Sequence, residues 1–142
     1  MNSLDPILDC IYIIDDDYAS TFYHKLLIKK GDYANVVMSF SSVETAIDHF
    51  FRRGEDYIHP DLILLDLNMP ALGGWDFLEA IQNNKSIFSP LPSIIIVSAS
   101  VNLEDRIRAD ESDLVFDYLS KPISNDALVK IIKKHLVKTR VN

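Results

Sequence analysis

The chain has 142 residues, of which 48% are hydrophobic and 25% are charged, proportions that exclude a disordered or low-complexity protein. Its formal net charge of −7 argues against a general nucleic-acid binder. No run of residues approaches the roughly 18 apolar positions of a membrane span, and the N-terminus shows no basic signal region. We therefore expect one cytoplasmic domain over residues 1–142, with its core near residues 9–136 and its single cysteine, Cys10, buried.

Five short apolar runs predict strands that are buried on both faces of a sheet. Each run has the length of a strand and is rich in Ile, Val, Leu or aromatic residues. In chain order, the runs are Leu8–Ile14, Val36–Phe40, Leu62–Leu65, Ile94–Val97 and Val115–Leu119.

Five segments with helical spacing alternate with these strands. The first begins after Asp17, a good N-cap residue, and has Gly31 as its stop. The second opens with a capping-box pattern at residues 41–44 and ends before Gly54. The others extend from Gly73-Gly74 to Asn84, over Asn102–Asp110, and from the cap Ser124 along an apolar stripe to Leu136.

This alternation predicts an α/β domain whose parallel sheet is covered by helices on both faces. Because crossovers are right-handed, few topologies suit so small a unit, and the flavodoxin-like order 2-1-3-4-5 is favoured. Ligands bind such sheets beyond the carboxyl ends of the strands, where the strand order reverses. The residues that follow each predicted strand are therefore the first candidates for a functional site.

Charged and hydroxyl side chains occur at these strand ends. They are Asp15, Asp16 and Asp17 after the first strand, Asp66 after the third, Ser98 after the fourth and Lys121 after the fifth. Two carboxylates 4 Å apart repel by roughly 4 kcal/mol at an effective dielectric of 20, so they stay ionised together only around a cation. Carboxylate, carbonyl and water oxygens suit Mg²⁺. With Lys121 as a second positive charge, Asp66 is a candidate nucleophile that forms an aspartyl phosphate.

Taken singly, each of these residues also has a structural interpretation. Asp17 serves as an N-cap, Asp15 and Asp16 suit a turn, and Asp66 suits the start of a turn before Met69-Pro70. The hypothesis of a site depends on their joint placement at the ends of neighbouring strands.

Four stretches of the chain resemble the receiver domain of two-component response regulators, and the resemblance extends from Asp9 to Leu136. The stretches are Ile13-Ile14-Asp15-Asp16-Asp17, Asp61–Pro70, Ile96-Val97-Ser98-Ala99 and Tyr118-Leu119-Ser120-Lys121-Pro122. The resemblance implies that Asp66 accepts a phosphoryl group from a phosphohistidine on a histidine kinase or phosphotransfer protein. It also implies that Mg²⁺ is bound by Asp16, Asp66 and the backbone carbonyl of Asn68, and by Asp15 through water.

The same resemblance implies how the phosphoryl group acts on the fold. Lys121 would pair with its oxygens, Ser98 would be the switch hydroxyl, and Tyr118 would be the aromatic residue that turns inward with it. The bond before Pro122 would be cis. A downstream protein target would dock on the face formed by the Asn102–Asp110 helix, the last strand and the last helix, and no nucleic acid or membrane is expected as a partner.

Some features depart from the usual receiver pattern or stay open. Many members carry an Asp where this chain has Gly73, which predicts a softer loop after Asp66. Asn68 and Ser100 occupy the positions associated with phosphoryl lifetime, which the sequence does not set. Six cationic residues lie from Lys121 onward, against one acid, and this segment is either a solvated helix face or a docking face for an acidic partner.

The leading hypothesis is a non-enzymatic, phosphorylation-dependent switch that acts by partner docking or phosphorelay. The alternatives are a haloacid-dehalogenase-type phosphatase, a flavodoxin-type binding module, and a receiver cut from a larger regulator or hybrid kinase. The phosphatase needs an acid at position 68, where this chain has Asn68, and the binding module needs a phosphate loop that is missing after the first strand. We expect Trp75 and the four histidines, His24, His49, His59 and His135, to be structural or surface residues.

Overall fold

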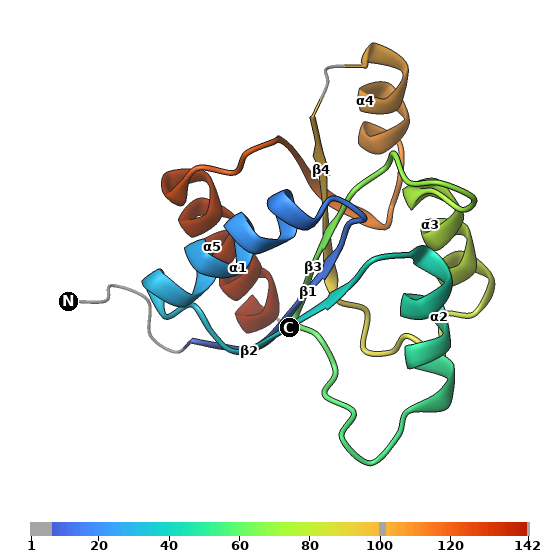
Figure 1. Cartoon of the computed structure of the whole chain (residues 1–142), viewed down its shortest axis with the longest axis horizontal. Helices are drawn as coiled ribbons and strands as arrows, with labels where there is room; N and C mark the ends of the chain where they lie inside the picture. The colour runs from blue at the N-terminus through green and yellow to red at the C-terminus, as the bar shows by residue number, and fades with distance from the viewer. Residues whose placement is uncertain (1–6, 100–101, 142) are drawn as a thin grey trace.

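The computed structural model describes residues 7–99 and 102–141, and it confirms the predicted α/β architecture (Figure 1). Five strands form one parallel sheet in the order β2-β1-β3-β4-β5, which is the flavodoxin-like order expected from the sequence. The strands are β1 (Leu8–Ile14), β2 (Ala34–Phe40), β3 (Leu62–Leu65), β4 (Ser93–Ser98) and β5 (Val115–Ser120).

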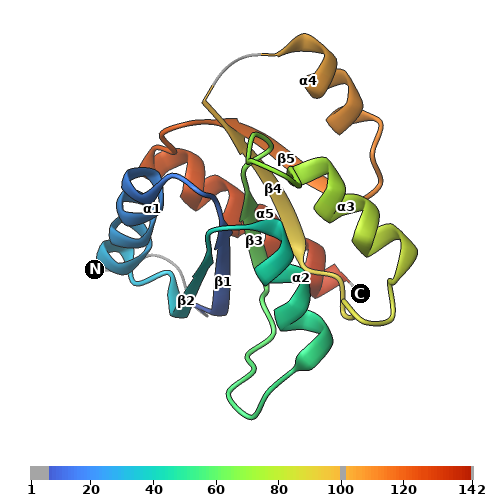
Figure 2. The same cartoon turned by 45° about the vertical axis from the view of Figure 1, so that its right-hand side comes forward.

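The helices cover both faces of the sheet. They are α1 (Tyr18–Gly31), α2 (Val43–Arg52), α3 (Gly74–Asn83), α4 (Leu103–Asp110) and α5 (Asn125–Val141). Helices α1 and α5 lie on one side, and α2 and α3 lie on the other, with α4 beyond the end of β4 (Figures 1 and 2). Among the described residues, no helix has both the length and the apolar character needed to cross a membrane.

Alternating residues of each strand pack into two separate cores, one on each face of the sheet, which explains why the strand sequences are continuously apolar. In β3, Leu62 and Leu64 pack toward Ile28 of α1 and Ile131 of α5. Their neighbours Ile63 and Leu65 pack on the opposite face, where the core also contains Phe50, Phe77 and Phe88. Because each strand is buried on both faces, polar residues are confined to the strand ends.

Helices α1 and α2 end at the glycines predicted for them, one at Gly31 and the other just before Gly54, but in neither case is the glycine the residue with positive φ. Gly31 is the last residue of α1, and Asp32 takes the left-handed conformation, with φ of 56°. The ring of Tyr33 occupies the space beside Gly31, where a Cβ would lie 2.0 Å from it, so this position accepts only a glycine without rearrangement. At the end of α2, Arg53 takes φ of 41° in place of Gly54.

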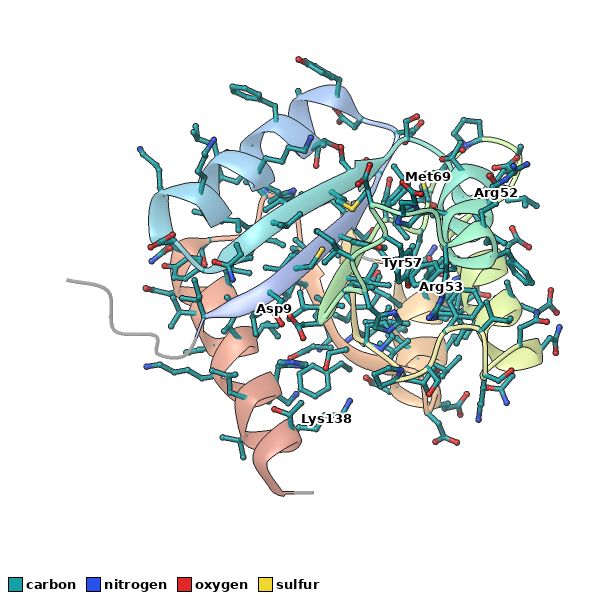
Figure 3. The ribbon with its side chains drawn as sticks, turned by 90° about the horizontal axis from the view of Figure 1, so that it is seen from below. Asp9, Arg52, Arg53, Tyr57, Met69 and Lys138 are labelled. Atoms are coloured by element: carbon teal, nitrogen blue, oxygen red, sulfur yellow. The ribbon has the colours of Figure 1, made fainter. Side chains whose placement is uncertain are left out.

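The segment between α2 and β3 is fastened by side chains. The guanidinium of Arg53 lies 4.7 Å from the ring centroid of Tyr57 (Figure 3). The Tyr57 hydroxyl contacts Nδ1 of His59 at 2.7 Å, and the other ring nitrogen of His59 lies 2.7 Å from the carbonyl oxygen of Pro90. His59 thus has the structural role expected of it.

Cys10 is buried, as predicted, and His135, expected to be a structural or surface residue, is buried too. Burial raises the pKa of the Cys10 thiol to about 12, and the charges of Asp61 and Asp9 add to this effect, so the thiol stays protonated. His135, on α5, is tied to the sheet through Nδ1, which lies 2.7 Å from the hydroxyl of Ser93. This bond lies at the amino end of β4, at the opposite edge of the sheet from the predicted site.

Candidate functional site

Backbone hydrogen bonds hold the predicted site residues at the carboxyl edge of the sheet. The amide of Asp15 donates to the carbonyl of Phe40 at 3.0 Å, and the amide of Asp66 donates to the carbonyl of Ile14 at 2.9 Å. The amide of Lys121 likewise donates to the carbonyl of Ser98 at 2.8 Å. The ends of β1, β3, β4 and β5 therefore meet, as the strand order requires.

Three carboxylates gather at this edge. Asp15, Asp16 and Asp66 each offer an oxygen within 4.8 Å of the others, and Asp15 and Asp66 are buried while Asp16 is exposed. One oxygen of Asp66 accepts a hydrogen bond from the backbone N–H of Asn68 at 3.3 Å. Hard oxygen ligands in this number suit a divalent cation such as Mg²⁺ better than a softer transition metal.

Lys121 balances part of this negative charge. Its Nζ lies 2.7 Å from Oδ2 of Asp15 and 3.6 Å from Oδ2 of Asp66, and its side chain is 12% exposed. Burial alone would lower the pKa of Lys121, but the hydrogen bond and charge of Asp15, with the charge of Asp66, raise it overall. The ammonium is therefore fully charged at neutral pH.

The environment of Asp66 opposes its ionisation. Burial raises the pKa of Asp66, the charge of Lys121 and the Asn68 amide lower it in part, and Asp15 and Asp16 raise it again. The net shift is upward, so the carboxylate is less stable than it would be in water. A cation bound among the three acids would relieve this cost.

The predicted switch residues lie on the two strands that follow β3 in the sheet, one at the end of β4 and one within β5. Ser98 ends β4 and is buried, and Tyr118 lies on β5 beside α4, where the guanidinium of Arg106 is 5.3 Å from its ring centroid. Among the described residues, the Tyr118 hydroxyl is the one buried side-chain polar atom without a hydrogen-bond partner. Ser100 lies outside the described residues. The Lys121–Pro122 bond is cis, as the resemblance implies.

Two glycines that begin α3 allow this helix to approach the site closely. A Cβ on Gly73 would lie 2.6 Å from the carbonyl oxygen of Leu67, and one on Gly74 would lie 2.7 Å from that of Asp66. The N–H of Gly73 also donates to the carboxylate of Asp76 at 2.8 Å. Gly73, expected to soften the loop, is thus held by close packing and a hydrogen bond.

Sequence reasoning missed one contact residue of the site. The Ser20 hydroxyl donates to Oδ2 of Asp15 at 3.0 Å, while Oδ1 of Asp15 accepts from the N–H of Asp17 at 2.9 Å. A weak signal was present, because Ser20 lies in the first turn of the helix that begins after Asp17, and so is close in the chain to Asp15.

Trp75 has the packing role predicted for it, but it reaches beyond its own helix. Its indole N–H donates to Asp105 of α4 at 3.0 Å, and the guanidinium of Arg108 lies 4.2 Å from its ring centroid. These contacts fasten the short, polar helix α4 to α3.

Comparison with curated proteins finds relatives among signalling proteins. The chain is 31% identical over 122 residues to the cell cycle response regulator CtrA of Brucella ovis, a match that covers 84% of this chain and 46% of that protein. It is 29% identical over 135 residues to hybrid signal transduction histidine kinase L of Dictyostelium discoideum, covering 92% of this chain and 8% of that protein. The chain thus spans less than half the length of these relatives.

Solved structures share the whole fold. A two component response regulator from Cytophaga hutchinsonii superposes with a TM-score of 0.82 at 26% identity, covering 92% of this chain and 98% of that one. A response regulator receiver protein from Dyadobacter fermentans gives a TM-score of 0.77 at 26% identity, with 89% and 97% covered. The model of the response regulator receiver domain matches residues 11–133, so the chain belongs to the receiver domain family of two-component signalling.

Proposed function

We propose that this protein is a signalling switch that accepts a phosphoryl group on Asp66 with Mg²⁺ bound. The observation that supports this proposal best is the arrangement at the carboxyl edge of the sheet. There, Asp66 lies within 4.8 Å of two further carboxylates and 3.6 Å from the ammonium of Lys121. A nucleophilic carboxylate with fixed positive charge beside it is the equipment of phosphoryl transfer.

The phosphoryl donor would be a phosphohistidine on a histidine kinase or a phosphotransfer protein. An oxygen of Asp66 forms a bond to phosphorus while the bond from phosphorus to the histidine nitrogen breaks, and the bonding electron pair returns to the imidazole. Lys121 and the N–H of Asn68 favour the ionised carboxylate that this attack requires. Asp15, Asp16, Asp66 and the backbone carbonyl of Asn68 would hold Mg²⁺, which supplies positive charge to the phosphoryl oxygens.

Phosphorylation would shift the population of two conformations of the domain. The aspartyl phosphate carries up to two negative charges in place of the one on the carboxylate, and Lys121 and the Ser98 hydroxyl would contact its oxygens in the active conformation. The Tyr118 hydroxyl, which has no hydrogen-bond partner among the described residues, gives up no bond when its side chain moves. Ser98 and Tyr118 would thereby connect the site to α4 and β5.

The face formed by α4, β5 and α5 would present the result to a downstream protein. On this face the ring of Phe116 lies 4.7 Å from Nζ of Lys134 and 5.0 Å from Nζ of Lys138. An apolar ring bordered by ammonium groups suits an acidic partner with an apolar anchor. A receiver within a larger regulator or hybrid kinase would use the same face.

The test is phosphorylation by a small donor. Incubation with acetyl phosphate and Mg²⁺ should give one base-labile phosphoryl adduct by intact-protein mass spectrometry. Asp66→Asn, or removal of the metal with a chelator, should abolish it. Asp117→Asn is the matched control, because Asp117 also pairs with a lysine, Lys134 at 3.4 Å, but lies outside the acidic cluster. An adduct that persists in Asp66→Asn would overturn the proposal, and turnover of phosphate esters would favour a phosphatase.

A further inference from the structure

A buried histidine lies behind the acidic cluster and bridges two segments of the chain. His24, on α1, is 3% exposed. Its Nε2 lies 3.2 Å from the backbone nitrogen of Ile123, whose N–H donates to it, and its Nδ1 lies 3.5 Å from the hydroxyl oxygen of Ser20. Both ring nitrogens of His24 are therefore engaged, one with the loop after β5 and one with the beginning of its own helix.

The geometry defines the protonation state of this ring. A backbone N–H can only donate, so Nε2 must be the unprotonated nitrogen, and a neutral ring then carries its hydrogen on Nδ1. Burial supports the neutral form, because it lowers the pKa of His24, an effect that Asp15 opposes and Lys121 reinforces. The hydrogen on Nδ1 faces the Ser20 oxygen, and the Ser20 hydroxyl directs its own hydrogen to Oδ2 of Asp15 at 3.0 Å.

These hydrogen bonds form part of a closed circuit of contacts that includes Lys121. Oδ2 of Asp15, which accepts from Ser20, also lies 2.7 Å from Nζ of Lys121. Lys121 and Ile123 belong to the same loop, two residues apart, so the path from Lys121 through Ile123, His24, Ser20 and Asp15 returns to its start. This circuit of contacts joins α1 to the β5–α5 loop immediately beside Asp66.

We propose that His24 is a positioning residue for phosphoryl transfer to Asp66. In its neutral form with hydrogen on Nδ1, it holds Ile123 on one side and Ser20 on the other, and so fixes the ion pair of Asp15 and Lys121. A lysine side chain is long and flexible, so its ammonium lies where its partners hold it. Without His24, Lys121 Nζ would be held less firmly at its 3.6 Å distance from Asp66. The inference rests on the proposed function, in which Lys121 contacts the phosphoryl oxygens.

The chain contains a matched control for this role. His135 is also buried and also contacts a serine, since its Nδ1 lies 2.7 Å from the Ser93 hydroxyl. That pair lies at the amino edge of the sheet, away from Asp66. Loss of either histidine should lower stability to a similar extent, but only loss of His24 should change the chemistry at the site.

The experiment measures the rate of adduct formation with acetyl phosphate and Mg²⁺, together with the melting temperature, for matched variants. His24→Leu should slow phosphorylation by about tenfold, the effect of losing one net hydrogen bond that positions the reacting groups. His24→Gln, whose carboxamide oxygen can accept from Ile123, should recover most of the rate. His135→Leu should melt at a temperature as low as that of His24→Leu but should react within about twofold of the wild-type rate.

Two further readouts test the path itself. Ser20→Ala should slow phosphorylation as well. The double variant with His24→Leu should lower the rate by less than the product of the two single fold-changes, because both residues act through Asp15. Nitrogen-15 NMR of the wild-type ring should show hydrogen on Nδ1 and none on Nε2. A wild-type rate in His24→Leu, or hydrogen on Nε2, would overturn this inference and leave the proposed function intact. Failure of the wild-type protein to form any adduct would overturn both.

Discussion

Replacing the proposed phosphoacceptor should make the metal-free protein more stable. In Asp66→Asn, the amide keeps the shape of the carboxylate and can still accept from the backbone N–H of Asn68. What disappears is a buried negative charge beside two others. Burial and the neighbouring acids raise the pKa of Asp66, so its ionised form costs folding free energy at neutral pH.

The magnitude follows from the distances at the site. Two carboxylates within 4.8 Å of each other repel by at least about 3.5 kcal/mol at an effective dielectric of 20, so Asp15 and Asp16 together oppose the ionised Asp66 by at least about 7 kcal/mol. The ammonium of Lys121, 3.6 Å from Oδ2 of Asp66, stabilises the ionised Asp66 by about 4.6 kcal/mol at the same dielectric. The net repulsion is at least about 2 kcal/mol, which corresponds to about 6 °C or more in melting temperature for a domain of this size. Lys121 keeps its closer partner, Asp15, after the substitution.

The assay is thermal unfolding in a chelator and again over a series of Mg²⁺ concentrations. Wild-type protein should gain stability with Mg²⁺, by about 2.7 kcal/mol at a concentration one hundred times the dissociation constant. Asp66→Asn lacks one of the three carboxylates and should gain much less, so its advantage should shrink as Mg²⁺ is added. Asp117→Asn should respond to Mg²⁺ as the wild-type protein does.

Two results would refute this reasoning. A metal-free Asp66→Asn that melts below the wild-type protein would mean that Asp66 is stabilised by its surroundings. An equal response to Mg²⁺ in Asp66→Asn and wild-type protein would mean that the cation does not bind among these acids.

Three other substitutions or conditions have definite expected outcomes. Gly74→Ala should destabilise the protein and slow phosphorylation, because the new Cβ would lie 2.7 Å from the carbonyl oxygen of Asp66. Gly54→Ala, with open space at its Cβ, should behave as wild type, and both effects are measured by thermal unfolding and by adduct formation. Burial lowers the pKa of His135, so the stability that depends on its neutral form is present above about pH 6.5 and is lost as the pH falls. The urea midpoint of the wild-type protein should therefore decline between about pH 7.5 and about pH 5.5, and His135→Gln should reduce this decline. Trp75→Phe should remove the hydrogen bond to Asp105, cost about 1 kcal/mol and speed amide hydrogen exchange in α4.

The sheet and the acidic cluster could be predicted from sequence because both depend on simple geometry. Parallel strands end at one edge, so a polar residue that follows a buried strand must lie there. Asp15, Asp66 and Lys121 follow three different strands, and their 2.7 Å and 3.6 Å contacts are a direct consequence of the strand order.

Other features depend on contacts that no local pattern records. Asp32 and Arg53 end their helices in the left-handed conformation although a glycine is adjacent in each case, and the ring of Tyr33 occupies the space beside Gly31. The link from Ser20 to Asp15 joins a helix to a strand end. It becomes visible only when the angle between α1 and the sheet is known.

The indole that joins α3 to α4 also makes the protein suited to optical measurement. Trp75 is the only tryptophan in the chain, and it lies 4.2 Å from a guanidinium and 3.0 Å from a carboxylate that both belong to α4. Emission from an indole responds to the charges around it, so the intrinsic fluorescence of the unlabelled protein reports the placement of this single helix. A stopped-flow trace after mixing with acetyl phosphate and Mg²⁺ would therefore follow movement of α4 in real time.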